Sequence, residues 1–380
     1  MHKMPEGKKE DKGFISALHV QQGIDQPEQV NELALRQLRN GRKPPLSAVQ
    51  FTDGILAGNR TILSQAITLV ESSLPEHQKI AQEVIRLCLP HTGNSLRIGI
   101  TGVPGVGKST FIEAFGSFLT NIGQKVAVLA IDPSSQRSKG SILGDKTRME
   151  RLSNDASAFI RPSPSAGSLG GVARKTQETL LLCEAAGFDV VLIETVGVGQ
   201  SETAVHGMVD FFLLMMLSGA GDELQGIKRG IMEMADAIII NKADGDNIQR
   251  AKLARAEYRN ALHLFSAPDS GWIPTVETCS SRTGDGIENV WETILKYREL
   301  TLANGHFANR RLKQAKETMM TSINASLKQM FFDNPQVKER LTKLESELME
   351  SKISPYIAAQ QLMEEWIGNI NHRDTEFTEA

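Results

Sequence analysis

The sequence predicts an α/β fold in which a doubly wound, mainly parallel sheet is flanked by helices, with helical extensions on both sides. Two observations support this prediction. Between about residues 93 and 300, short apolar runs alternate with longer stretches of helical periodicity. The glycine-rich stretch Gly102–Ser109 (GVPGVGKS) lies between an apolar run and a helical stretch, where a parallel α/β sheet binds its ligand.

The alternation gives a definite set of elements. Seven apolar runs are the expected strands: Arg97–Thr101, Val126–Ile131, Ala158–Ile160, Val190–Glu194, Phe211–Leu217, Ala237–Asn241 and Ile273–Thr278. The longest expected helices are Ser109–Ile122, Gly171–Ala186, Gln225–Met234, Ile248–His263 and Ile287–Leu300.

The flanking regions lack strand signals. Residues 1–25 are polar and are expected to be disordered. Residues 26–92 carry three apolar stripes at helical spacing, which predict a helical region packed beside the sheet domain of residues 93–300. Residues 301–380 form a charged helical extension, with helices expected over 307–331 and 334–370. Its seam of Leu341, Leu344, Leu348 and Ile353 packs either on a second copy or on the same chain, and a dimerisation arm is our hypothesis.

Gly102–Ser109 reads G-x-x-x-x-G-K-S, the phosphate-binding loop of P-loop nucleotide hydrolases. Glycines let backbone N–H groups curl around phosphate oxygens, and the following helix adds its unpaired N–H groups. Lys108 would reach the β- and γ-phosphates, and the Ser109 hydroxyl would bind Mg²⁺. The alternative is a turn that only connects strand to helix. The expected phosphate contacts are Gly102, Pro104, Gly105, Val106, Gly107, Lys108, Ser109 and Thr110.

A second motif, Asn241–Asp244, predicts which base the bound nucleotide carries. Asn241-Lys242-Ala243-Asp244 at a strand end matches N-K-x-D, the guanine-reading element of P-loop GTPases. An Asp carboxylate accepts from both N1–H and the exocyclic amine of guanine, whereas adenine offers no such pair. The run Ser280-Ser281-Arg282 follows the next strand and is the expected second base-contacting segment. Together the two segments favour GTP and GDP over adenine nucleotides.

Acidic residues at strand ends are the candidates for Mg²⁺ and water. Glu194 ends one strand, Asp132 ends another and Asp145 follows in the sequence LGDKTR. Carboxylates there would complete the Mg²⁺ shell, while the Gly197 N–H would sense the γ-phosphate. Taken singly, Asp132 and Asp145 could instead be turn or cap residues.

One position departs from the Ras pattern. Ras-like GTPases carry a water-orienting Gln directly after the glycine that Gly197 matches, but this chain has Val198, and Gln200 lies two positions further on. We therefore expect slow, partner-dependent hydrolysis. The glycine-rich loop 218–228 follows a buried strand and could move with nucleotide state, although it could also be an ordinary connection.

Composition and charge indicate the broad class of protein to which this chain belongs. The formal net charge is -3, so we expect neither nucleic acid nor an anionic membrane as partner. The three cysteines are widely spaced and odd in number, which fits a reducing compartment. The N-terminus resembles neither a secretory signal nor a transit peptide, and the longest apolar run, Phe211–Leu217, is too short to cross a bilayer. These features predict a cytoplasmic enzyme.

Six motifs in this order carry a family resemblance: GVPGVGKST, AIDPSS, SILGDKTRM, IETVGVGQSE, GAGDELQGIK and NKAD. They resemble the methylmalonyl-CoA mutase-associated GTPases, the MeaB, ArgK or MMAA type within the SIMIBI class. The match spans roughly residues 55 to 300. The resemblance implies a homodimeric GTPase chaperone for adenosylcobalamin-dependent acyl-CoA mutases, such as methylmalonyl-CoA mutase, that gates and protects the cofactor. It also implies that Ser109, Asp132, Asp145 and Glu194 surround Mg²⁺.

The resemblance further makes the loop with Asp222, Gln225 and Lys228 a switch that couples nucleotide to partner. The sequence lacks the D-x-H-x-x-G motif that binds cobalamin, so the partner would carry that cofactor. Two other functions stay open. One is a kinase linked to lysine, arginine and ornithine transport, which would transfer phosphate to a protein. The other is a metallochaperone GTPase, for which the sequence lacks a His-rich or Cys-x-x-Cys segment.

Overall fold

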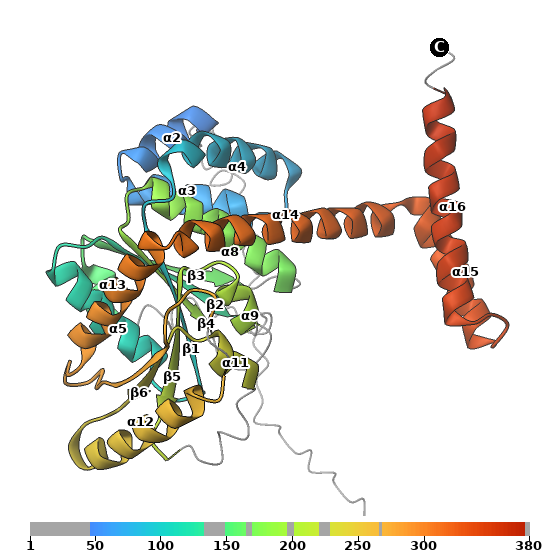
Figure 1. Ribbon diagram of the computed structural model, residues 1–380. Helices are drawn as coiled ribbons and strands as arrows, with labels where there is room; N and C mark the ends of the chain where they lie inside the picture. The colour runs from blue at the N-terminus through green and yellow to red at the C-terminus, as the bar shows by residue number, and fades with distance from the viewer. Residues whose placement is uncertain are drawn as a thin grey trace, which may run out of the picture. The chain divides into compact units, whose positions relative to one another are not determined.

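The computed structural model describes residues 46–132, 149–164, 169–195, 201–219, 229–265 and 268–376. Within these ranges, seven parallel strands form one sheet in the order β3-β2-β4-β1-β5-β6-β7, flanked by helices (Figure 1). This arrangement confirms the predicted fold class. The strands are β1 (Leu96–Gly102), β2 (Val126–Asp132), β3 (Ala158–Pro164), β4 (Val190–Thr195), β5 (Phe211–Leu217), β6 (Ala237–Asn241) and β7 (Thr275–Thr278).

The helices of the sheet region are α5 (Lys108–Asn121), α7 (Glu150–Asn154), α8 (Leu169–Ala185), α9 (Ser201–His206), α11 (Arg229–Met234), η3 (Gly245–Asn247), α12 (Ile248–Leu262) and α13 (Ile287–Ala303). Four of the five predicted helices of this region begin and end within three residues of the predicted positions, and for the fifth, α11, residues 225–228 lie outside the described ranges. The last strand starts two residues later than predicted. Ile273 is 75% exposed and Pro274 has no N–H to donate to the sheet, so β7 begins only at Thr275.

The sheet has a hydrophobic core on each face because side chains alternate along its strands. Phe211, Leu213 and Met215 of β5 point into the core that contains residues of α5 and α13. Leu214 and Met216 point into the opposite core, which contains residues of α11 and α12. Since β1 lies between β4 and β5, the chain winds in both directions from it. The crevice at the carboxyl end of β1 is thus the expected ligand position of this fold.

Three helices precede β1: α2 (Ala48–Leu56), α3 (Arg60–Glu71) and α4 (Pro75–Cys88), followed by the short η1 (Leu89–His91). They bury most of the second and third predicted apolar stripes, with Leu63, Ile67 and Val84 each no more than 1% exposed, whereas Leu74 is 50% exposed. All three helices also contact α8. The first predicted stripe, Val30 to Leu38, lies outside the described residues.

The C-terminal extension consists of α14 (His306–Asp333), α15 (Pro335–Met349) and α16 (Pro355–Glu376). The predicted stretch 334–370 is therefore two helices. They are separated where Ser351 adopts a left-handed φ of 56° and Pro355 begins α16. Leu344 is buried with Ala358 and Leu362 of α16, and the rest of the seam packs around them. The predicted seam thus packs on the same chain, which was one of the two open alternatives.

Two arginines join α14 to the amino edge of the sheet. Arg311 donates to both carboxylate oxygens of Asp210, at 2.7 and 2.6 Å, and Arg310 donates to Asp236 at 3.2 Å. The two aspartates also accept backbone N–H groups of Arg97 and Phe212. Burial raises the pKa of Asp236, and the Arg310 guanidinium opposes this. Removing one partner of such a buried pair costs about 3–5 kcal/mol, so the start of α14 is firmly held on the sheet domain.

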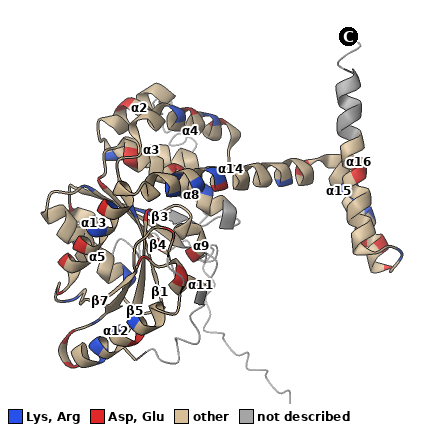
Figure 2. Cartoon of the chain, viewed as in Figure 1, with Lys and Arg blue, Asp and Glu red and all other residues tan. Residues whose placement is uncertain are grey.

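The outer helices carry charges of both signs, as α12 and α15 show (Figure 2). Across the described ranges, every helix is too short or too polar to cross a bilayer.

Candidate functional site

The phosphate loop lies at the carboxyl end of β1 and leads directly into α5. Two of its glycines are required by geometry. A Cβ on Gly102, whose φ is +153°, would lie 2.3 Å from the Met215 carbonyl oxygen. A Cβ on Gly107, with φ +92°, would lie 3.1 Å from the Asn241 amide nitrogen. Val106 is fully buried and anchors the loop, whereas Pro104 and Gly105 are exposed at its tip. The loop backbone is therefore open to a ligand while its ends are fixed.

Lys108 begins α5 and lies over the loop. Its Nζ donates to the Gly102 carbonyl oxygen at 2.8 Å. Burial lowers the pKa of this ammonium, and the carboxylates of Glu194 and Glu202 act in the opposite direction. The Val103 carbonyl oxygen lies at 3.5 Å from the same Nζ, and the charge-assisted bond to a phosphate oxygen would be stronger than either of these bonds to neutral carbonyls. Thr110, also predicted to contact nucleotide, is exposed in the same first turn.

Ser109 and Glu194 meet beside the loop. The Ser109 hydroxyl donates to Glu194 Oε1 at 3.1 Å, and Glu194 is only 4% exposed. Glu194 reaches this position because β4 pairs with β1 and places Glu194 opposite Ile100. A hydroxyl and a carboxylate are ligands that Mg²⁺ accepts, so the pair fits a magnesium ion bound with nucleotide.

Of the other two predicted acids, the structure describes the backbone of Asp132 and does not describe Asp145. Asp132 is the last residue of β2, the neighbour of β4, so its backbone lies at the same edge of the sheet. Asp145, Gly197, Val198 and Gln200 lie outside the described residues, as does the segment with Asp222, Gln225 and Lys228.

The N-K-x-D segment is tied to the phosphate loop by two hydrogen bonds. Asn241 Nδ2 donates to the Val106 carbonyl at 2.8 Å, and Lys242 Nζ donates to the Gly105 carbonyl at 2.8 Å. Lys242 has a left-handed φ of 59°, which is uncommon for a residue other than glycine and marks a constrained position. The predicted base-reading and phosphate-binding segments are therefore one connected structure.

The segment after β7 positions the predicted base reader. Ser280 Oγ donates to Asp244 Oδ2 at 2.5 Å, while Ser281 donates to Asn241 Oδ1 from both its backbone N–H and its hydroxyl. The Ser280 bond orients the Asp244 carboxylate, which is half-buried, and both carboxylate oxygens keep lone pairs that can accept from a base. Arg282 is exposed at the edge of the same segment.

One buried acid near the loop is missing from the sequence-based prediction. Glu202, in α9, is 5% exposed and acts electrostatically on Lys108. The only signal in the sequence is its place in the stretch IETVGVGQSE, since burial depends on contacts that no local pattern records.

The comparisons with known proteins agree with this geometry. A family model described as methylmalonyl-CoA mutase-associated GTPase MeaB matches residues 63–336. GTPase ArgK of Escherichia coli is 46% identical over 307 residues, covering 81% of this chain and 93% of ArgK. The mitochondrial methylmalonic aciduria type A homolog of Mus musculus is 46% identical over 320 residues, covering 82% of this chain and 77% of that protein.

A solved structure shows the same fold. The crystal structure of a LAO/AO transport system kinase aligns with a TM-score of 0.68 at 38% identity, covering 85% of this chain and 99% of that one. The phosphate loop, the N-K-x-D segment joined to it and the family match over most of the chain lead to one assignment: this protein belongs to the methylmalonyl-CoA mutase-associated GTPase family, MeaB.

Proposed function

We propose that this GTPase is a nucleotide-controlled chaperone of an adenosylcobalamin-dependent acyl-CoA mutase, such as methylmalonyl-CoA mutase, and that it gates loading and protection of the cofactor. The observation that carries the proposal is the family match over residues 63–336, whose description names the mutase. The name of the mouse relative, a methylmalonic aciduria type A homolog, points to the same metabolism.

In this proposal the nucleotide site is the switch. Backbone N–H groups of residues 105–109 and the Lys108 ammonium hold the phosphates of GTP or GDP, and Asp244 reads guanine. Ser109 and Glu194, with Asp132 and Asp145, would hold Mg²⁺, which neutralises charge on the β- and γ-phosphates when bound. The contact from Asn241 to the phosphate loop lets both ends of the nucleotide act on one connected structure.

The mutase interaction can be tested by co-purification. Tagged protein is mixed with purified adenosylcobalamin-dependent mutases, in the presence of either GDP or a non-hydrolysable GTP analogue. We expect one mutase to be retained, with an affinity that differs between the two nucleotides. Retention of none of the mutases in either nucleotide state would contradict the proposal.

The solved kinase structure suggests a second candidate, phosphoryl transfer to a protein of a transport system. The two functions differ in where the γ-phosphate goes. With GTP labelled on the γ-phosphate, a GTPase releases the label as inorganic phosphate, whereas a kinase leaves it on an acceptor protein. We expect quantitative release as phosphate.

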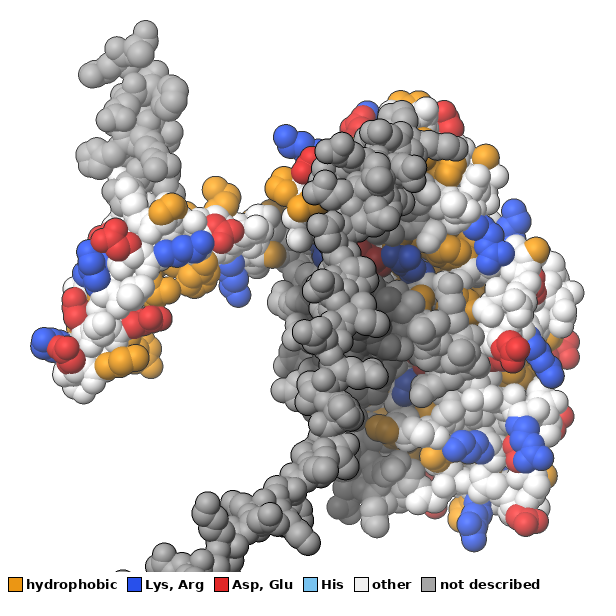
Figure 3. Space-filling model, turned by 180° about the vertical axis from the view of Figure 1, so that it is seen from behind, with side chains coloured by type: hydrophobic (Ala, Val, Ile, Leu, Met, Phe, Trp, Pro, Cys, Tyr) orange, Lys and Arg blue, Asp and Glu red, His pale blue; other side chains and the backbone are white. Residues whose placement is uncertain are grey.

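We further propose that residues 301–380 are a dimerisation arm attached to a GTPase domain of residues 93–300, with residues 26–92 as its helical neighbour. The support is an apolar stripe on α14. Met319, Ile323, Leu327 and Met330 recur at helical spacing and are each at least 43% exposed. Figure 3 shows hydrophobic side chains on the surface of these C-terminal helices. Such contiguous exposed apolar surface typically marks an interaction site.

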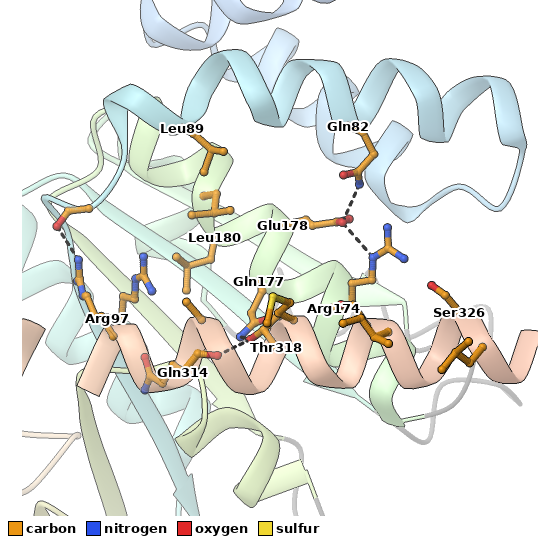
Figure 4. Close-up of a pocket in the computed structure, with 18 residues that line it drawn as sticks. Gln82, Leu89, Arg97, Arg174, Gln177, Glu178, Leu180, Gln314, Thr318 and Ser326 are labelled. Carbon is orange, nitrogen blue, oxygen red and sulfur yellow. Dashed lines mark hydrogen bonds and ion pairs between the residues drawn. The ribbon is translucent and has the colours of Figure 1, made fainter. Parts of the chain in front are cut away.

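Met319, Ile323 and Leu327 of this stripe line a groove between α4, α8 and α14, with a volume of about 810 Å³ (Figure 4). Leu89, Leu180 and Ile323 are among its apolar lining residues. Its rim is polar: Glu178 accepts from Gln82 at 2.8 Å and from Arg174 at 3.1 Å. An apolar centre with a polar rim is the usual anatomy of a protein interface, and we assign it to a second copy of the chain.

Light scattering on the eluting protein tests the dimer. We expect twice the mass of one chain for the native protein and for Leu253→Asp, a control on α12 where the side chain is 63% exposed. Ile323→Asp places a charge on the α14 stripe and should give the mass of one chain. A native monomer at micromolar concentration, or a dimer unaffected by Ile323→Asp, would rule out this interface.

We also propose a cytoplasmic location. Cys88, Cys183 and Cys279 are buried free thiols, which suits a reducing compartment. Burial raises the pKa of Cys279 to about 12, so this thiol stays protonated and unreactive.

A further inference from the structure

Helix α9 is packed closely against the face of β1 opposite to α5. A Cβ added to Gly99 would lie 2.8 Å from Val205 Cγ1, so the missing side chain lets α9 approach the strand. After α9 the chain turns at the amino edge of the sheet, where Asp210 N donates to the Arg97 carbonyl. The helix therefore runs antiparallel to β1, and Glu202, three residues before Val205, lies towards the carboxyl end where the phosphate loop begins.

The Glu202 side chain is buried with one of its two carboxylate oxygens unpaired. The residue is 5% exposed, and its Oε2 atom has no hydrogen-bond partner among the described residues. Burying a carboxylate oxygen without a partner is costly, and nearly all buried polar atoms in proteins are paired. An unpaired buried oxygen beside a ligand site indicates a partner that arrives with the ligand.

The surroundings of Glu202 identify that ligand site. Lys108, the phosphate-binding lysine, is within electrostatic reach of both Glu194 and Glu202. Glu194 already accepts the Ser109 hydroxyl at 3.1 Å, as expected for the magnesium side of the site. The two buried carboxylates thus have different environments, and such a pair usually divides two roles between its members.

Hydrolysis needs a group that orients the attacking water, and the position used by Ras-like proteins is Val198, which has no side-chain group that can donate or accept a hydrogen bond. Glu202 lies four residues further along, in the first helix after that segment. We propose that Glu202 is the catalytic residue that holds the attacking water through its Oε2 atom during GTP hydrolysis.

The water oxygen forms a bond to the γ-phosphorus while the bond from that phosphorus to the β–γ bridging oxygen breaks, and GDP leaves with the electron pair. The water proton passes to the Glu202 carboxylate and then to solvent, so the residue is restored after each turnover. A positioned base of this kind contributes typically about 10²–10⁴-fold to a rate.

The test is Glu202→Gln, which keeps the shape of the side chain but cannot take the proton. At saturating GTP we expect kcat to fall by roughly 100-fold or more, with KM and GDP affinity essentially unchanged. Glu202→Asp keeps a shortened carboxylate and should retain more activity than the Gln variant. The matched control is Glu184→Gln, an equally buried glutamate that pairs with Arg97 near the amino end of β1. It should lose stability but keep its kcat.

Three results would overturn the proposal. One is native kcat in Glu202→Gln, and another is equal rates in the Asp and Gln variants. The third is an equal loss of kcat in Glu202→Gln and Glu184→Gln, because this would reveal a structural effect. Thermal denaturation identifies any variant that does not fold. If Glu202→Gln does not fold, the kcat of Glu202→Asp is compared with that of the native protein instead, and an unchanged kcat would overturn the proposal.

Discussion

Lys108→Ala is expected to abolish measurable GTP hydrolysis and to weaken GTP binding. The native ammonium lies over the phosphate loop, 2.8 Å from the Gly102 carbonyl oxygen, where the phosphates are expected to bind. Charge-assisted contacts to phosphate oxygens strengthen as negative charge develops in transfer. Loss of one preorganised donor to developing negative charge typically lowers kcat by about 10²–10³-fold, which takes an already slow intrinsic hydrolysis below detection. Steady-state phosphate release and binding of a fluorescent GTP analogue measure the two effects.

The control for this variant is Lys296→Ala. Lys296 lies on α13, 68% of its side chain is exposed, and its ion pair is with Glu292 on the same helix. The Lys296→Ala variant removes the same positive charge as Lys108→Ala, but at a position whose ion pair lies away from the phosphate loop. Native turnover in Lys108→Ala would contradict the assignment of the phosphate site, as would an equal loss in the two variants.

Asp244→Asn is expected to reverse the choice of nucleotide base. The native carboxylate is oriented by Ser280 and can accept two hydrogen bonds from guanine. An amide offers one acceptor and places its NH₂ donor against the exocyclic amine of guanine. Two charge-assisted bonds, at about 1.5–3 kcal/mol each, correspond to a loss of GTP affinity of at least about 10²-fold.

The same variant should gain affinity for XTP. Xanthine carries a carbonyl oxygen where guanine carries its amine, so an amide side chain at this position can donate to that oxygen and accept from N1–H. Asp246→Asn is the matched control, because Asp246 is exposed two residues further along the same loop. Competition binding with GTP, ATP and XTP separates the effects. Retained preference for GTP in Asp244→Asn would refute the base-reading role.

The sequence was most informative where function depends on backbone shape and local chemistry. Gly102 and Gly107 have positive φ values, and a side chain at either would contact Met215 or Asn241. Such positions tolerate few other residues, so the motif is visible in the sequence alone. The strands were equally visible, because β1, β4, β5 and β6 are buried on both faces and read as continuous apolar runs.

The sequence does not predict which surface an apolar helical face packs against when two surfaces are available. The seam with Leu344 was compatible with a second copy or with the same chain, and the structure pairs it with Leu362 of α16. The prediction missed the break between α15 and α16, although the seam spacing lengthens to five residues between Leu348 and Ile353 and Pro355 begins α16. The dimer proposal consequently rests on a different surface, the exposed stripe of α14.

By itself, then, the sequence determined the parallel α/β fold and predicted the phosphate loop and the base-reading segment. In each of these the required residues lie close together in the chain, and a glycine or a strand-end side chain has few substitutes. Only the tertiary structure decided that Leu344 packs with Leu362, that Arg311 holds α14 on Asp210 and that Glu202 is buried near Lys108. These contacts join distant segments. Burial and electrostatic partners depend on how helices pack against the sheet, and no spacing along the chain records that packing.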